Sequence, residues 1–306
     1  MRVLIVARCK NGHYAPFITE QVEAIERQGI DCQFFGVDGN GIWGYLRQIP
    51  KLRKVIRDFQ PDIIHAHYGL CGLLANYQRR VPVVTTYHGS DINDPKVLQL
   101  SKRSIQRSRF NIFVSQKNIN IAKPEKDYAL IPCGINLKDY PIIEKVEARR
   151  RIGLDADKKY VLFAGAFDNP VKNAPLAKAA MDFVTEAELL ELKGYTRSQV
   201  ATLMQAVDAF LMTSHTEGSP QVIKEAMACG CPIVSVDVGD VRDRIEGIAG
   251  CFISEPFPES LSRNILSALS YNGRTQGRLQ IEKRGLTNAE IASRIINVYS
   301  ALVLNQ

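Results

Sequence analysis

The chain has 306 residues, of which 45% are hydrophobic and 23% charged, and its formal net charge is +7. Its length allows one large α/β domain or two of ordinary size, and we expect two. This composition indicates a globular protein with a sizeable core and excludes disordered and collagen-like chains.

The apolar stretches are short. Residues 160–167 form one of them, far below the roughly 20 residues that a membrane-spanning helix needs. Arg8 interrupts the apolar N-terminal stretch, so we expect a first strand there rather than a signal peptide. Seven cysteines, an odd set without a C-x-x-C motif, favour reduced thiols and a cytoplasmic location.

Positive charge is concentrated in the first part of the chain. Residues 1–141 contain 20 Lys and Arg against 12 Asp and Glu, whereas the remainder contains 19 against 20. A basic surface can meet nucleic acid, an anionic membrane or an anionic substrate, and charge alone does not choose among them.

Residues 1–141 alternate strand and helix patterns, which predicts a doubly wound parallel sheet. Residues 2–7 read as a strand, Asn11 and Gly12 as a turn, and Ile18, Val22 and Ile25 recur at helical spacing. The further strands expected are 32–37, 62–66, 83–87, 111–114 and 128–131, and the further helices are 45–59 and 69–77.

Between about residues 140 and 159 the chain becomes polar, and we place a domain boundary there. Strands are expected again at 161–167, 188–192, 209–213 and 232–236, with helices at 174–183, 197–206 and 220–229. The expected domains are residues 1–141 and 142–288, followed by a C-terminal helix within 289–306 that can return to the first domain.

Residues 213–232 form the strongest candidate site. Ser219 is a suitable N-cap and Pro220 suits the first helical position, which would leave free amides at Gln221 and Val222 for an anion. Glu217 precedes this helix end, and Glu225 lies where it could reach a ribose. The alternative is an ordinary capped helix with a surface glutamate.

These residues resemble a known signature. Glu217 and Glu225, followed by Ala-Met-Ala-Cys-Gly-Cys-Pro-Ile-Val, are similar to the motif of family 4 retaining glycosyltransferases. Four more segments occur in the order of that family: residues 61–67, 84–91, 113–115 and 131–136. The resemblance covers nearly the whole chain and implies a GT-B fold, in which two doubly wound Rossmann-like domains face a central cleft.

The resemblance also implies roles for individual residues. Glu225 would bind the donor's ribose, Glu217 the donor sugar, and residues Gly218, Ser219, Pro220, Gln221 and Val222 the sugar and diphosphate. Lys172 would stabilise the departing diphosphate, and His88 would lie near the transferred sugar. Gly12 would let the backbone approach the substrates, and Tyr195 would form a wall of the base pocket.

The chain departs from the family pattern in the segment around Lys172 and in the extent of its second domain. Ala166 stands where the family has an arginine, and Asn173 stands where it has a glycine. The chain leaves no room between Leu192 and Arg197 for a helix and strand usual in the family, so we expect a compact second domain. Because Lys172, His88 and both glutamates remain, we interpret these departures as those of a compact subfamily.

Other motifs carry less weight. Gly39, Gly41 and Gly44 match a dinucleotide fingerprint but follow the second strand, so we interpret them as a loop. Asp155 and Asp157 imitate a metal-binding D-x-D pair, yet they lie in the polar interdomain stretch and are expected to be solvated.

Two pairs of metal-ligand residue types remain. His65 and His67 share a strand face without a further ligand at metal-binding spacing, which favours a structural or cleft-lining role. Cys229 and Cys231 are interpreted as packing residues.

A basic amphipathic helix is expected over residues 45–59, with Arg47, Lys51, Arg53, Lys54 and Arg57 on it. Such a helix can bind an anionic membrane surface weakly, or it can pack on the sheet with a solvated face. No nucleic-acid-binding module accompanies the charge, so no nucleic-acid partner is expected.

The sequence therefore predicts a cytoplasmic, metal-independent retaining glycosyltransferase that needs no cofactor and can lie peripherally on the inner face of the membrane. It would transfer sugar from a nucleotide-diphosphate donor to a hydroxyl acceptor, a glycan or a lipid-linked molecule of cell-surface polysaccharide or glycolipid synthesis. Two alternatives remain: a catalytically silent nucleotide-sugar-binding partner in glycan assembly, and a nucleotide-sugar epimerase of the same fold.

Overall fold

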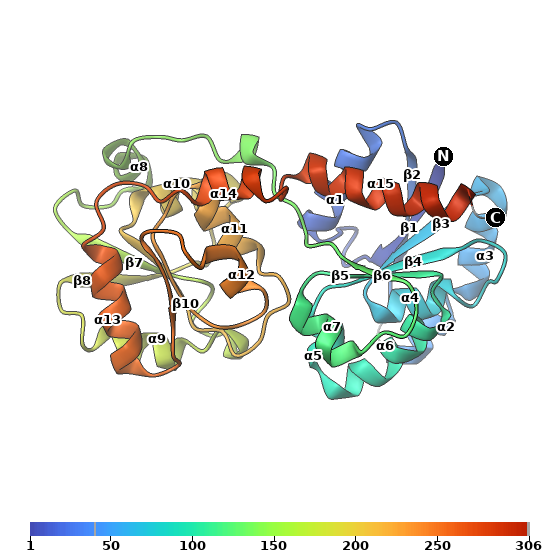
Figure 1. Ribbon diagram of the computed structural model, residues 1–306, viewed down its shortest axis with the longest axis horizontal. Coiled ribbons are helices and arrows are strands. Elements are labelled where there is room, and N and C mark those ends of the chain that lie inside the picture. Colours follow the sequence, from blue (N-terminus) through green and yellow to red (C-terminus); the bar gives the residue numbers. More distant parts are fainter. Residues whose placement is uncertain (40, 305–306) are drawn as a thin grey trace. The chain divides into compact units, whose positions relative to one another are not determined.

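The computed structural model describes residues 1–39 and 41–304 and divides them into two compact units, shown in Figure 1. Unit 1 comprises residues 1–134 and the C-terminal stretch from residue 288, and unit 2 comprises residues 135–287. The chain enters unit 2 earlier than the expected boundary after residue 141. Ile135 and Tyr140 account for this difference, because both are buried in the core of unit 2.

Unit 1 is built on a six-stranded, fully parallel sheet with the order β2-β1-β3-β4-β5-β6. Its strands are β1 (Arg2–Arg8), β2 (Asp31–Val37), β3 (Ile63–His67), β4 (Val83–Tyr87), β5 (Phe110–Phe113) and β6 (Tyr128–Leu130). Its helices are α1 (Pro16–Glu26), α2 (Gly41–Leu46), α3 (Ile49–Phe59), α4 (Gly69–Ala75), α5 (Ser90–Asn93), α6 (Pro95–Arg107), α7 (Gln116–Ala122) and α15 (Asn288–Leu304).

Helices cover both faces of this sheet, as expected for a doubly wound arrangement. Along β1, Val3, Ile5 and Ala7 pack with α1 and α15, whereas Leu4 and Val6 pack with the α3 and α4 side. The last helix, red in Figure 1, therefore completes a layer that begins with the blue helix α1.

Unit 2 has a five-stranded parallel sheet with the order β11-β10-β9-β7-β8. Its strands are β7 (Lys159–Phe163), β8 (Ala187–Glu191), β9 (Ala209–Met212), β10 (Ile233–Val236) and β11 (Cys251–Ser254). Its α-helices are α8 (Lys145–Ile152), α9 (Ala174–Met181), α10 (Arg197–Ala206), α11 (Gln221–Ala228), α12 (Val241–Ile245), α13 (Pro258–Leu269) and α14 (Gly277–Lys283), and its short 3-10 helices are η1 (Leu137–Asp139) and η2 (Pro170–Lys172).

One expected helix is wrong in its extent. Residues 45–59 do not form a single helix, because α2 ends at Leu46 and α3 begins at Ile49 with Pro50 in its first turn. The loop interpretation is wrong for Gly41 and Gly44, which lie in α2, and a Cβ added to Gly44 would lie 2.9 Å from the carbonyl carbon of Gly39. Residue 40 lies outside the described residues.

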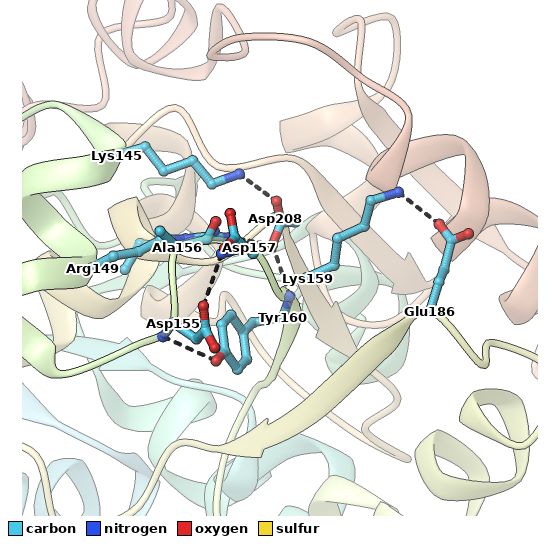
Figure 2. Close-up of polar contacts among 10 residues, drawn as sticks. Lys145, Arg149, Asp155, Ala156, Asp157, Lys159, Tyr160, Glu186 and Asp208 are labelled. Carbon is cyan, nitrogen blue, oxygen red and sulfur yellow. Dashed lines mark hydrogen bonds and ion pairs between the residues drawn. The ribbon is translucent and has the colours of Figure 1, made fainter.

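Asp208, just before β9, ties α8 to the sheet of unit 2 (Figure 2). Its carboxylate contacts Lys145, lies 2.8 Å from Nη2 of Arg149, and accepts the amide of Tyr160 at 2.7 Å. Asp155 and Asp157 lie beside the contacts of Asp208, and both are exposed. The Asp155 carboxylate accepts the Asp157 amide at 2.9 Å, so this D-x-D pair forms a solvated local turn, as expected.

Within the described part of the chain, no helix combines the length and apolar character needed to cross a bilayer.

Candidate functional site

The first group of candidate residues lies in unit 2, where the loops after β7, β9 and β10 leave the carboxyl edge of the parallel sheet. This edge is the usual ligand site of such sheets. Lys172 follows β7 and Glu217 follows β9, and their side chains form an ion pair of 2.7 Å between Nζ and Oε1. The loop after β10 adds Asp240, whose carboxylate accepts the Ser219 hydroxyl at 2.7 Å.

The backbone around Lys172 is held against the end of β9. The Thr213 hydroxyl lies 3.0 Å from the carbonyl oxygens of both Lys172 and Asn173, to which it can donate. Gly165 leaves room for the lysine side chain, since a Cβ there would lie 2.9 Å from Cγ of Lys172. The position of this cation is thus defined by the two neighbouring strand ends.

The Lys172–Glu217 pair is only partly shielded, with side-chain exposures of 20% and 17%. Charge-assisted bonds of this kind are strong, and a lysine can exchange a carboxylate for phosphate oxygens. The pair therefore places a cation and a carboxylate side by side at the rim of the sheet.

The helix after Glu217 begins differently from the expectation. α11 starts at Gln221, Pro220 is its N-cap, and Ser219 does not cap it. The Ser219 hydroxyl instead donates to Asp240 and accepts from Nζ of Lys224 at 2.9 Å. Lys224 is fully buried and also donates to Oε1 of Gln221 at 2.6 Å, so polar side chains, rather than a serine cap, fix the turn before α11.

Glu225 lies in the middle of α11 and is largely buried. The Tyr140 hydroxyl donates to its carboxylate, and Arg197 Nη2 lies 3.4 Å from the same hydroxyl. Burial raises the pKa of Glu225, while the hydrogen bond from Tyr140 and the charge of Arg197 oppose this rise. Glu225 is therefore not an ordinary surface glutamate.

The structure accounts for one of the two residue differences from the family pattern. Asn173 has φ 56° and ψ 53°, the left-handed conformation that glycine adopts most readily and asparagine tolerates. Asparagine can therefore replace the glycine without changing the local backbone. Ala166 supplies no cation, and its side chain is partly exposed.

The remaining donor-site candidates differ in their exposure. Gly218 is buried, and its carbonyl oxygen would lie 2.5 Å from a Cβ added to Gly239. Val222 is partly buried in the first turn of α11, and Tyr195, before α10, is 39% exposed.

Gly12 belongs to unit 1. It forms the tip of a tight turn with Asn11, both having positive φ, and Lys10 and His13 exchange backbone bonds of 2.9 Å across it.

The second group of candidates is a row of histidines on unit 1. His65 and His67 of β3 lie with ring centroids 4.6 Å apart, and His67 stacks on His88 at 5.3 Å. His67 Nδ1 is 3.0 Å from His88 Nε2, and His65 bonds with Tyr299 of α15 at 2.5 Å and with Thr86 at 2.8 Å. We call His65, His67 and His88 the histidine row.

Asp91 fixes the backbone at the outer end of this row. Its carboxylate accepts the amides of His88 and Gly89, each at 3.0 Å, and of Gly69 at 2.9 Å. Burial raises the pKa of Asp91 to about 6, although the three hydrogen bonds from backbone amides favour the charged form and lower the pKa. His88 is thus held by its backbone through Asp91 and by its ring through His67.

A hollow of about 780 Å³ opens beside Asp91 at the carboxyl ends of β1 and β3. Its lining includes Arg8, Lys10 and His13 and the aromatic rings of Tyr14, Tyr45 and Tyr68. Cations and aromatic surface together suit a polar ligand that carries negative charge.

No group of three or more His, Cys, Asp or Glu side chains within residues 1–39 and 41–304 is arranged to hold a metal ion. Cys229 is fully buried, and Cys231 is nearly so.

Family models match both units of the chain. The model described as Glycosyltransferase Family 4 matches residues 8–139, and the model described as Glycosyl transferases group 1 matches residues 155–271. The chain belongs to the family 4, group 1 glycosyltransferases.

Curated relatives agree with this membership. A protein of Bacillus subtilis described as a teichuronic acid biosynthesis glycosyltransferase, TuaC, is 28% identical over 60% of this chain and 55% of its own length. The N-acetyl-alpha-D-glucosaminyl L-malate synthase of Bacillus anthracis is 25% identical over 64% of this chain and 62% of its own length. The chain thus spans less than two thirds of the length of these relatives.

Solved structures show the fold to be GT-B. A sucrose-phosphate synthase from Thermosynechococcus elongatus superposes with a TM-score of 0.86 at 17% identity, covering 100% of both chains. HepE of Anabaena, solved with UDP and glucose, superposes with a TM-score of 0.74 at 16% identity, covering 98% of this chain and 100% of its own.

Sequence reasoning missed four residues that hold the candidate sites. Tyr140, Lys224 and Asp240 support α11 and Glu225, and Asp91 holds His88. Asp91 and Lys224 lie inside the matched motifs, but only the structure shows what their side chains contact. Tyr140 lies at the start of the polar stretch, in none of the motifs recognised in the sequence.

Proposed function

We propose that this chain is a retaining glycosyltransferase that moves a sugar from a nucleotide-diphosphate donor to a hydroxyl acceptor. The observation that carries the proposal is the Lys172–Glu217 ion pair beside the start of α11, with Glu225 further along the same helix. The family membership supports transferase chemistry, and the UDP and glucose named with the HepE structure support this donor class.

The donor would bind to the carboxyl edge of unit 2. Its diphosphate would meet Lys172 and the amides of Gln221 and Val222, because a helix N-terminus favours anions. Glu225 would accept hydrogen bonds from the ribose, Glu217 would bind the sugar, and Tyr195 would border the base. Gly218, Ser219 and Pro220 would shape the turn over the diphosphate.

In the proposed reaction, the bond between the anomeric carbon and the diphosphate oxygen breaks, and the leaving diphosphate keeps the electron pair. The acceptor oxygen bonds to the same face of the carbon, so the anomeric configuration is retained. The acceptor proton passes to a leaving phosphate oxygen, and Lys172 stabilises the negative charge that accumulates there. His88 would contact the transferred sugar, and the reaction would need no metal ion or cofactor.

The acceptor would bind to unit 1. The hollow lined by Arg8, Lys10 and three tyrosines, next to the loop that carries His88, is the proposed acceptor pocket, and Gly12 lies in the turn between Lys10 and His13. Its cations favour an acceptor with a phosphate or carboxylate group, as in a lipid-linked or acidic glycan. Polysaccharide or glycolipid synthesis is the proposed context, for which the TuaC relative gives support.

The first test is a thermal-shift screen of uridine, guanosine, adenosine and thymidine diphosphate sugars on the wild type and Glu225→Ala. A donor that stabilises the wild type and not the variant supports the donor site. The matched control is Glu188→Ala, an exposed glutamate of β8 in the same unit. Transfer assays with that donor, with and without a chelator, then test turnover and metal independence, and NMR of the product gives the anomeric configuration.

The other outcomes distinguish the alternatives. Binding without transfer or hydrolysis would favour a silent nucleotide-sugar-binding partner, which Ala166 supports. Conversion of the donor without any acceptor would favour an epimerase. No stabilisation by any of the four donor classes would contradict the proposed donor site.

We further propose a weak peripheral contact between unit 1 and the anionic inner face of the cytoplasmic membrane. Arg53 and Arg57 of α3 line a hollow of about 730 Å³ with Arg79 and Arg80. The adjoining hollow of about 700 Å³ adds Arg107, Arg109 and Lys126. Cations near an anionic bilayer contribute about 1 kcal/mol each.

Sedimentation with phosphatidylglycerol vesicles at low salt tests this contact, with phosphatidylcholine vesicles as the neutral comparison. The double variant Arg79→Glu and Arg80→Glu should abolish cosedimentation. The same charge change at the exposed Lys102 and Arg103 of α6, which line neither hollow, should reduce it much less. Equal loss in both double variants would contradict a localised contact.

A further inference from the structure

The middle ring of the histidine row contains an unusual polar atom. His67 is fully buried, and its Nε2 has no hydrogen-bond partner among the described residues, whereas its Nδ1 lies 3.0 Å from Nε2 of His88. His67 therefore has one hydrogen bond for two ring nitrogens, and its partner is the ring proposed to touch the sugar.

Two neutral arrangements of this pair are possible. If His88 donated through Nε2, the proton of His67 would lie on its Nε2, and a buried N–H would have no acceptor. If His67 donates through Nδ1, its Nε2 is only a bare acceptor. Orphaned buried N–H groups are rarer than under-satisfied acceptors, so the second arrangement is favoured.

The second arrangement decides where the proton of His88 resides. Its Nε2 accepts from His67, so its own proton is on Nδ1, which lies 3.7 Å from Sγ of Cys133. Charging His88 would require a proton on Nε2 as well, and His67 would then have to accept it and leave its own N–H unpartnered. The pair therefore resists protonation.

We propose that His67 is a positioning residue that holds His88 neutral, with its proton on Nδ1. This inference rests on the proposed function only in giving His88 a role in transfer, because the tautomer itself is a property of unit 1. Burial lowers the pKa of His67 well below its ordinary value, with the neighbouring His65 and His88 rings acting in the same direction. A neutral His67 agrees with its unpartnered Nε2, because a charged ring would carry a buried N–H without an acceptor there.

Other groups around His88 must be considered in any pH experiment. The ring centroids of Tyr68 and His88 are 4.6 Å apart, and Sγ of Cys133 lies 3.7 Å from Nδ1 of His88. The Asp91 carboxylate accepts the backbone amide of His88. Burial raises the pKa of Asp91 to about 6, so titration of Asp91 must be separated from that of His88. An observation specific to the ring nitrogens is therefore needed.

The test is long-range ¹H–¹⁵N NMR of the full chain with ¹⁵N-labelled histidine, between pH 5 and 9. In the wild type we expect His88 to show protonated Nδ1 and bare Nε2 and not to titrate near pH 6.5. His67→Ala opens a polar space that water can enter, so His88 should titrate with a pKa higher by about one unit or more. His67→Asn keeps a donor amide near the Nδ1 position and should restore the wild-type behaviour.

The matched control is His65→Gln, which changes a ring that stacks on His67 and whose nitrogens bond with Tyr299 and Thr86. It should leave the His88 nitrogens unchanged. A proton on Nε2 of His88 in the wild type, or equal ¹⁵N shifts of His88 in the wild type and His67→Ala, would overturn the proposal.

Kinetics give a second readout. The acid limb of kcat/KM should move to higher pH in His67→Ala and not in His67→Asn. Because the NMR result needs no substrate, absence of transferase activity would count against the proposed function and leave the tautomer measurement intact.

Discussion

The two candidate sites hold their polar groups in opposite ways. On unit 1, His65 and His67 are buried and neutral, and stacked rings and short hydrogen bonds connect them to Tyr299 and His88. On unit 2, Lys172 and Glu217 keep their charges as a partly exposed pair. Burial selects neutral groups because it penalises charge, whereas a rim position lets charges remain and change partners.

This difference indicates how each site would respond to a ligand. The neutral rings on unit 1 are fixed before any substrate arrives, because their hydrogen bonds are internal. The ion pair on unit 2 can rearrange when an anion enters, since Lys172 can exchange the carboxylate for phosphate oxygens. The candidate site of unit 1 is therefore fixed in advance, whereas the ion pair of unit 2 can change partners when a ligand binds.

The largest effect is expected at the adjustable charge. Lys172→Ala should lower turnover about 100-fold or more, because a group that stabilises a developing anion contributes on this scale. Acceptor KM should change little. The control is Lys193→Ala, which removes an exposed lysine paired with Asp168 at 2.7 Å in the same unit. Unchanged turnover in Lys172→Ala would remove it from the leaving-group role.

The next prediction concerns the neutral rings. Burial lowers the pKa of His65 to about 3 in the folded protein, compared with 6.5 ordinarily. Below pH 6.5 the unfolded chain therefore binds a proton that the folded chain does not, and the free energy of unfolding falls with decreasing pH. The His65 contribution to this loss is about 2 kcal/mol between pH 7 and 5.

His65→Gln keeps a hydrogen-bonding side chain but cannot titrate, so it should lose less stability over this pH range. Urea denaturation of both proteins at pH 7 and 5 measures the difference. Asp91 acts in the opposite direction, because its raised pKa makes the folded state bind protons, but it is present in both proteins. Equal losses in the two proteins would contradict the burial argument for His65.

A smaller effect is expected at Tyr140, which supports Glu225. Tyr140→Phe removes a hydrogen bond that lowers the pKa of this glutamate, and nucleotide Kd should rise about 5- to 10-fold. Titration calorimetry with the donor found in the screen measures it. Tyr160→Phe is the control, since its buried hydroxyl accepts the Asp155 amide at 3.2 Å away from Glu225. Equal Kd values for all three proteins would argue against Tyr140 as a support for the ribose site.

The smallest effect is expected at the Asn11–Gly12 turn. Gly12→Ala has open space around its new Cβ but keeps a φ of 79°, which costs about 1 kcal/mol for an L-residue. Thermal unfolding should show this loss alone if Gly12 serves only the turn. A drop in kcat/KM much larger than this stability change would support close approach of substrate to its backbone.

The local patterns of the sequence predicted most of the fold. Alternating apolar strands and helical spacings gave the parallel sheets, and the two glutamates with Lys172 identified the edge of unit 2. The predicted start of α11 was wrong, because the Ser219 hydroxyl bonds with Asp240 and Lys224 instead of capping the helix amides. Such side-chain contacts depend on separate loops meeting at one edge, which no local pattern encodes.

The same reason explains the missed partners of the histidine row. His65 and His67 are recognisable as sharing a strand face, but Tyr299 comes from the last helix and His88 from the next strand end. Asn173 is the converse case, because its tolerance of the left-handed conformation is a local property that the sequence alone could have suggested.

Helix α15 also has a consequence for the order in which the chain can fold during synthesis. Residues 135–287 form a contiguous unit and can fold as soon as they leave the ribosome, whereas unit 1 needs Ile291, Ile295 and Tyr299 from a much later stretch. Although the N-terminal sheet is synthesised first, the face of β1 and β3 that packs against α15 would stay uncovered until α15 leaves the ribosome. The second unit can thus be finished before the first, the reverse of the usual N-terminal-first order.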